Sequence, residues 1–199
     1  MITQSVHSDD GGREGKWVAL SIAIILIIAA FTLPMHQASS KGQILAPYQV
    51  SISDLATPEL AMVADLRLAH EEIRNIHQDN RDFEPSIPSD ELWPELVELE
   101  EIWLAPFVKD KSWEYKGKHQ WLHIAPAYYQ GVKQVAQGSA SVILHTGNND
   151  PEIWFALFDS AQPLTRNLEQ PYVLLSPEKL IEAGWIQVVF ASASDSHVH

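Results

Sequence analysis

The chain has 199 residues, of which 46% are hydrophobic, and its 26 acidic and 13 basic side chains give a net charge of −13. This length suits one domain with a hydrophobic core, and the shortage of Lys and Arg argues against a nucleic-acid partner, because binding phosphates requires a concentrated basic face. The absence of cysteine excludes disulfides, thiolate zinc sites and thiol nucleophiles.

The first feature along the chain is an apolar run, residues 17–33, which follows a short polar tail at 1–16. The run contains only two polar side chains, Ser21 and Thr32, and no charge. A helix needs about 17 to 20 apolar residues to span a bilayer, and a buried helix of a soluble domain would normally show a polar stripe. The run therefore predicts a transmembrane anchor.

Flanking charges set the expected orientation of this anchor. Arg13 and Lys16 precede the run, whereas Lys41 is the only nearby cation that follows it. Because Lys and Arg favour the cytoplasmic side, we expect a single-pass protein of the bacterial inner membrane, with a cytoplasmic N-terminus and a periplasmic C-terminal domain. The alternative is a cleaved export signal, since a cut after Ser40 would leave small residues at the two required positions.

Residues 34–56 are mostly small or polar and include two prolines, which predicts a linker. A helix is expected to begin at Thr57, a good capping residue, with Pro58 in its first turn. Its apolar residues recur at spacings of four and three and form one stripe: Met62, Leu66, Ala69, Ile73 and Ile76.

A second helix is expected over 94–104. The residues predicted to face the core from it are Leu96, Leu99, Ile102 and Trp103. The period then changes to two, and "SWEYKGKHQWLHI" predicts a hairpin with its turn at residues 116–118. One face of that hairpin would carry Trp113, Tyr115, His119, Trp121 and His123.

The C-terminal third of the chain reads mainly as strands. "SASVILH" and "EIWFALFD" predict two strands joined by the turn "TGNNDP", "YVLL" predicts a short strand, and "WIQVVFA" predicts a closing one. "SPEKLIEAG" predicts a helix that ends at Gly184, and residues 126–138 stay ambiguous. The fold class expected for 57–192 is α+β, with helices packed on a mainly antiparallel sheet, followed by a tail at 193–199.

Histidine offers the main chemical signal, because neutral imidazole is a common nitrogen ligand of zinc. His119 and His123 would lie on one strand face about 13 Å apart, so each needs a further ligand, such as His145 from a neighbouring strand. The tail adds Asp195, His197 and His199, which could wrap one ion and bind zinc transiently. The competing interpretations are a packed aromatic face for the strand histidines and a tail without function.

Other motifs of catalytic sites do not fit. "AHEEIRNIH" lacks the H-E-x-x-H spacing, because Arg74 stands where the second histidine is required, and His70 and His77 instead extend the apolar stripe as packed histidines. The chain has no G-x-S-x-G elbow and no glycine-rich phosphate-binding motif. We therefore expect a protein that is not an enzyme.

Several stretches together carry a resemblance to a known group of proteins. They are "WVALSIAIILIIAAF", "LRLAHEEIRNI", "LWPELVELEEIWLAPF" and "GKHQWLHIAPAYYQG" followed by "SASVILH" and "EIWF". This combination resembles uncharacterised single-pass bacterial envelope proteins that accompany ABC importers for zinc and related metals. The resemblance implies an accessory role in zinc uptake or homeostasis, by transient metal binding or by docking to the importer. The alternative function is that of a structural or assembly subunit of another cell-envelope complex.

Overall fold

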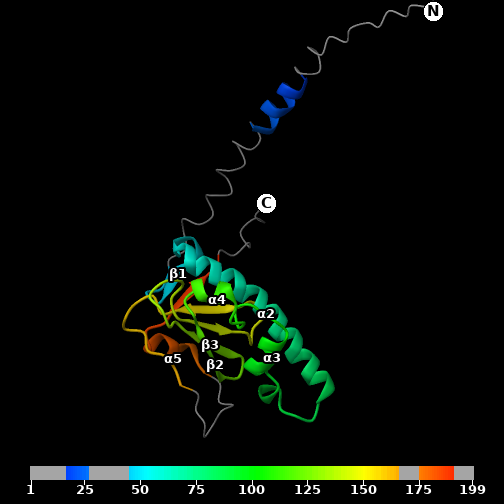
Figure 1. Cartoon of the computed structure of the whole chain (residues 1–199), viewed down its shortest axis with the longest axis vertical. Coiled ribbons are helices and arrows are strands. Elements are labelled where there is room, and N and C mark those ends of the chain that lie inside the picture. Colours follow the sequence, from blue (N-terminus) through cyan, green and yellow to red (C-terminus); the bar gives the residue numbers. More distant parts are fainter. Residues whose placement is uncertain (1–16, 27–44, 166–174, 191–199) are drawn as a thin grey trace, which may run out of the picture. The chain divides into compact units, whose positions relative to one another are not determined.

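The structure, a computed structural model, describes residues 17–26, 45–165 and 175–190 (Figure 1). Residues 17–26 form a helix whose apolar side chains are exposed, including Trp17 and Ile25. They belong to a different unit from the compact domain Leu45–Phe190. Within the described ranges no helix is both long enough and apolar enough to cross a membrane, and residues 27–33 of the expected anchor lie outside those ranges.

The centre of the domain is a six-stranded mixed sheet in the order β1-β6-β5-β4-β3-β2. Its strands are β1 (Gln49–Ser51), β2 (Gln120–Ala125), β3 (Tyr128–Val132), β4 (Val142–His145), β5 (Glu152–Phe155) and β6 (Ile186–Val189). The first and last strands, β1 and β6, run parallel, and the other four pairs are antiparallel. The predicted α+β class is therefore confirmed.

Helices cover both faces of this sheet (Figure 1). The helices described in the domain are η2 (Ile52–Asp54), α2 (Thr57–Phe83), η3 (Ser89–Glu91), α3 (Leu96–Glu101), α4 (Lys111–Tyr115) and α5 (Pro177–Glu182). The 27-residue helix α2 packs on one face, and the short helix α5 packs on the other.

Strand alternation divides the core into two layers. On β4, Val142 and Leu144 point toward α2, whereas Ile143 points toward α5. The buried residues that fill the α2 layer include Met62, Val63, Leu66, Ala69, Ile73, Leu99, Phe107, Trp121, Tyr129, Ile153 and Phe155. Those of the α5 layer include Ile124, Tyr128, Trp154, Leu180 and Trp185. The stripe predicted on α2 is thus confirmed as its buried face.

The prediction for the second helix is wrong at its end. Helix α3 stops at Glu101, and Trp103 adopts a left-handed backbone conformation with φ of 60°. The helix thus ends before these two residues reach the core, and Trp103 is 78% exposed while Ile102 is 48% exposed. Only Leu99 of the predicted inward-facing residues is fully buried, while Leu96 packs at the edge of the core.

The predicted hairpin over 112–124 is also wrong in its first half. Residues 111–115 form helix α4, because the Asp110 carboxylate accepts a hydrogen bond from the Trp113 amide at 2.8 Å and caps the helix. Strand β2 pairs instead with β3, which lies in the region left ambiguous by the sequence. The strands β4, β5 and β6 and the helix α5 form where the sequence predicts them.

The folded domain also begins earlier than the expected boundary at residue 57. Strand β1 and helix η2 lie within the predicted linker 34–56, and β1 is held by its ladder with β6. The predicted strand at 172–175 and the tail at 193–199 fall almost entirely outside the described residues.

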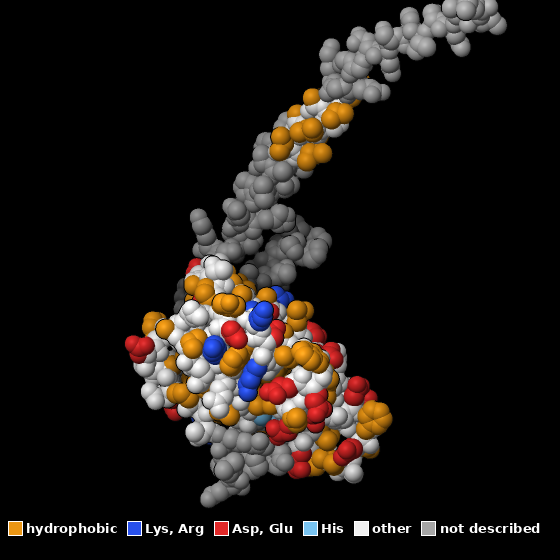
Figure 2. Space-filling view, in the orientation of Figure 1, with side chains coloured by type: hydrophobic (Ala, Val, Ile, Leu, Met, Phe, Trp, Pro, Cys, Tyr) orange, Lys and Arg blue, Asp and Glu red, His pale blue; other side chains and the backbone are white. Residues whose placement is uncertain are grey.

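Between Asp54 and Glu101 the chain has 14 acidic and 3 basic residues, and Figure 2 shows acidic side chains gathered on the side formed by α3 and the end of α2.

Candidate functional site

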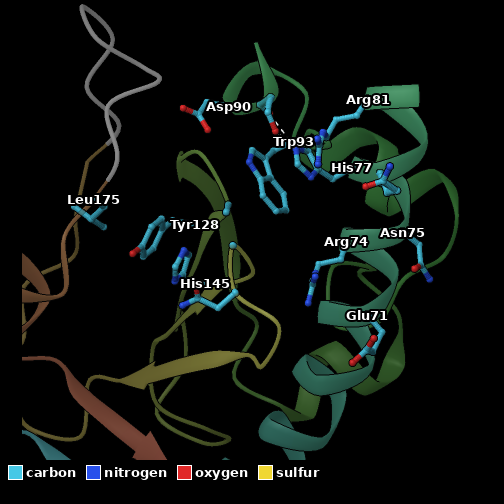
Figure 3. A pocket seen from close by; sticks show the side chains of 15 residues that line it. Glu71, Arg74, Asn75, His77, Arg81, Asp90, Trp93, Tyr128, His145 and Leu175 are labelled. Atoms are coloured by element: carbon cyan, nitrogen blue, oxygen red, sulfur yellow. Dashed lines mark hydrogen bonds between the residues drawn. The ribbon is translucent and has the colours of Figure 1, made fainter. Parts of the chain in front are cut away.

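A cleft of about 770 Å³ opens at the end of the sheet where β4 ends and β3 begins (Figure 3). One wall is the C-terminal half of α2, and the loop that follows α2 closes the cleft with Trp93. The facing wall is formed by the ends of the two strands and the loop after β4. The side chains that matter for its chemistry are Glu71, Arg74, His77, Arg81, Asp90, Trp93, Tyr128 and His145.

His145 is the predicted metal ligand that this cleft contains. As the last residue of β4 it lies beside Tyr128 of β3 and opposite Glu152 of β5. Its ring stacks on that of Tyr128 with a centroid distance of 4.0 Å and an interplanar angle of 7°. Its Nδ1 lies 3.2 Å from Oε2 of Glu152. Because a carboxylate only accepts, Nδ1 carries the proton and the lone pair is left on Nε2.

Glu152 is held in its ionised form by this arrangement. The hydrogen bond from His145 lowers the pKa of Glu152 below its ordinary value, against the opposing effect of burial. The Asn148 side-chain amide donates a second hydrogen bond to Oε1 at 2.6 Å. Two donors thus fix the carboxylate, and the carboxylate fixes the orientation and tautomer of the imidazole.

Gly147 keeps the space next to His145 Nε2 open. A methyl group at Gly147 would lie 2.6 Å from Nε2, which is closer than any van der Waals contact allows. The backbone of Gly147 is not in the left-handed region, so its conformation does not require glycine. Among the described residues, none is hydrogen-bonded to Nε2 of His145. The lone pair of this nitrogen is therefore available to a ligand in the cleft.

The opposite wall is built around His77 of α2. Its ring stacks on Trp93 at 3.7 Å with an interplanar angle of 3°, and its Nε2 donates to the Ser89 carbonyl oxygen at 2.9 Å. Burial lowers the pKa of His77 below its ordinary value, so this imidazole is neutral at neutral pH. The expectation that His70 and His77 are packed histidines is confirmed, because both are buried.

Two side chains of α2 fasten the loop between β4 and β5 to the helix. His70 Nε2 donates to the carbonyl oxygen of Asn149 at 3.0 Å, and the Arg74 guanidinium donates to Oδ1 of the same residue at 3.1 Å. The neighbouring Asn148 holds Glu152. The two walls of the cleft are thereby connected, which fixes His145 relative to α2.

The other two predicted strand ligands lie away from this cleft. His119 is buried, and its Nε2 bonds to the Ala140 carbonyl oxygen at 2.9 Å. Desolvation lowers the pKa of His119. His123 stacks on Tyr129 at 4.7 Å, and its Nδ1 lies 3.3 Å from Oε1 of Glu95. The expected placement of both residues on one strand is correct only for His123, because β2 begins at Gln120 and His119 precedes it. Both rings nevertheless contact aromatic residues of the α2 layer, His119 with Trp121 and His123 with Tyr129.

The register of the sheet separates His145 from these two residues. His123 pairs with Tyr129, which pairs with Leu144, so these three side chains share the α2 face. His145 follows Leu144 and points to the other face. The expectation that His145 completes a site with His119 or His123 is therefore wrong. Within the described ranges no three His, Asp or Glu side chains come together to hold a metal ion; Asp195, His197 and His199 lie outside those ranges.

Comparison with known proteins assigns the chain to one family. A model described as "Family of unknown function (DUF6162)" matches residues 50–193, more than two thirds of the chain. The chain belongs to the DUF6162 family. The match extends from β1 past β6, so it includes both walls of the cleft. No curated protein and no solved structure matches this DUF6162 chain.

Sequence reasoning missed most of the residues that surround His145 in this DUF6162 domain. Glu152 carried a usable signal, because counting outward from the predicted turn "TGNNDP" places it opposite His145. Tyr128 gave none, since the residues around it fit neither period. The contribution of Arg74 and His77 depends on the packing of α2 beside the strand ends, which no local pattern encodes.

Proposed function

We propose that this DUF6162 protein is a membrane-anchored accessory protein that binds zinc transiently outside the cytoplasm and assists metal uptake without catalysing a reaction. The observation that carries the proposal is the His145–Glu152 pair, which leaves Nε2 of His145 facing a cleft. A histidine whose other ring nitrogen donates to a carboxylate is the common arrangement of metal-ligating imidazoles in proteins. His145 fits that role because Glu152 is its carboxylate partner, Nδ1 carries the proton, and Nε2 is accessible from the cleft.

The composition of the cleft supports transient binding of zinc as cargo. Zinc prefers four ligands in a closed structural site, and the described residues bring no such group together. An ion held by His145 would keep other coordination positions for water or for a ligand that arrives with it. Such an open site exchanges its ion readily, which suits a protein that receives metal and passes it on.

The proposed anchor rests on the apolar run 17–33, of which residues 17–26 are helical with exposed apolar side chains. We expect the full chain expressed in bacteria to sediment with the membranes, and a reporter enzyme that is active only outside the cytoplasm to be active when fused after His199. A chain starting at Leu45 serves as the control and should be recovered in the soluble fraction. Activity of a cytoplasm-restricted reporter at the same fusion point would contradict the proposal.

The zinc-binding part is tested by calorimetric titration of the full chain in which both tail histidines, His197 and His199, are replaced by glutamine. In this background we expect His145→Gln to weaken zinc binding at least about tenfold. His123→Gln, on the other face of the sheet, is the matched control and should leave affinity unchanged. Equal zinc affinity in the parent and the His145→Gln variant would remove His145 from the proposal.

A second function, that of an assembly subunit of an envelope complex, is favoured by one observation. Trp103 is 78% exposed at the end of α3 and is presented by a left-handed turn, and exposed tryptophans are enriched where proteins bind one another. A photocrosslinker placed at residue 103 in cells separates the two functions. Capture of the permease subunit of a metal importer supports importer docking, and capture of another envelope protein supports the assembly role.

A further inference from the structure

The cleft is much larger than a single ion requires. Its volume of about 770 Å³ lies in the range of pockets that hold small organic ligands. If the cleft served a bare zinc ion, further ligands would be expected close to His145, and the described residues supply no group of three. The remaining volume is instead lined by charged and aromatic side chains, which implies a ligand with an organic part.

Two arginines of α2 form the cationic part of this lining. Arg74 and Arg81 are seven residues apart, so they lie on the same side of the helix about 10 Å from each other. In Figure 3 the Arg74 guanidinium reaches from α2 toward the wall that carries His145. Arg74 uses one nitrogen for Asn149, and Arg81 has no hydrogen bond or ion pair with another described residue. Guanidinium groups bind carboxylates with paired hydrogen bonds.

Two acidic residues balance the positive charge of these arginines. Glu71 and Asp90 also line the cleft, so the four charged groups of the lining sum to zero. Such a lining offers little attraction to a highly charged free anion, although it can hydrogen-bond the individual carboxylates of a ligand whose overall charge is small. A polycarboxylate that has bound a divalent cation is such a ligand, because the two positive charges of the cation cancel two of its negative charges.

We propose that the cleft receives zinc already complexed by a small polycarboxylate chelator, with the chelator's carboxylates on Arg74 and Arg81 and an open coordination position of the metal on Nε2 of His145. This inference rests on the proposed function and names the form in which the metal arrives. The flat surface of the stacked Trp93 and His77 rings lies between the two arginines along α2 and supports the organic part of the ligand.

The test uses the full chain with His197 and His199 replaced by glutamine, titrated separately with zinc chloride, citrate and a preformed 1:1 zinc–citrate complex. We expect zinc–citrate to bind at least about tenfold more tightly than citrate alone and more tightly than zinc alone. Arg81→Gln should weaken zinc–citrate binding about tenfold and leave the binding of zinc alone unchanged. Because Arg81 is exposed, this variant is expected to fold normally.

The outcomes separate this inference from the proposed function. If zinc binds through His145 but citrate adds no affinity, or if Arg81→Gln affects both forms equally, the chelate inference is overturned and the proposed function stands. If neither zinc nor zinc–citrate binding responds to His145→Gln, the proposed function fails as well. Tight binding of citrate without metal would show a plain anion site and would overturn the chelate inference.

Discussion

Leu66→Ala is expected to lower the free energy of unfolding by about 3 kcal/mol, within the roughly 2–5 kcal/mol found for buried leucines. Leu66 is fully buried at the centre of the α2 stripe, between the helix and the sheet. Its truncation removes apolar contacts and leaves a cavity that neighbours on two secondary-structure elements cannot easily fill. Urea unfolding of the full chain, followed by tryptophan fluorescence, measures the change.

Leu68→Ala provides the matched control for this substitution. Leu68 lies two residues further along the same helix but is 73% exposed, so the same chemical change there should cost less than about 0.5 kcal/mol. Both variants alter helix propensity equally, which leaves burial as the difference. Similar losses in the two variants would mean that α2 is not packed on the sheet through the face described above.

Gly147→Ala is expected to weaken zinc binding by between about tenfold and 100-fold, the range found when groups around a metal-ligating histidine are changed. The added methyl would lie 2.6 Å from Nε2 of His145, and the ring cannot move away freely because Tyr128 stacks on it and Glu152 holds Nδ1. Calorimetric titration in the background without tail histidines measures the effect.

The control for Gly147→Ala is the same substitution in a chain that already carries His145→Gln. If the methyl acts by blocking Nε2, it should have no further effect on zinc binding once that nitrogen is gone. A loss of the same size in both backgrounds would mean that alanine disturbs the loop rather than the ligand. Thermal unfolding of the single variant, expected to stay close to that of the parent, distinguishes a local from a global change.

The parts of the fold that sequence predicted correctly have either a long period or a short apolar run beside a clear turn. The stripe from Met62 to Ile73 on α2 repeats often enough to identify both the helix and its buried face. The apolar runs at 142–145 and 152–155 identify strands but no single buried face, because both faces of these strands are buried. Helix α4 was missed because one capping carboxylate, Asp110, outweighs an alternation of only a few residues. Strand β1 was missed because its three residues pair with β6, far away in the chain.

Only the part of the site that depends on local sequence could be predicted. His145 could be selected by its chemistry, and Glu152 by its place across a turn. Which face His145 occupies depends on β3, since the pairing of His123 with Tyr129 and of Tyr129 with Leu144 sets the alternation. Because β3 could not be recognised in the sequence, the sequence did not show that His145 and His123 lie on opposite faces of the sheet. The positions of Arg74 and Trp93 in the cleft depend on tertiary packing, for which the local sequence gives no signal.

The parallel pairing of β1 with β6 has a consequence for how the domain is made. Among the strands that the structure describes, β1 pairs with β6 alone, and β6 is the last of them along the chain. The ribosome must therefore finish Val189 before the first strand can find its place. A chain without β6 would lose the partner of β1, and any pull transmitted along the backbone from the N-terminal side would be resisted by pairing with a segment made more than 130 residues later.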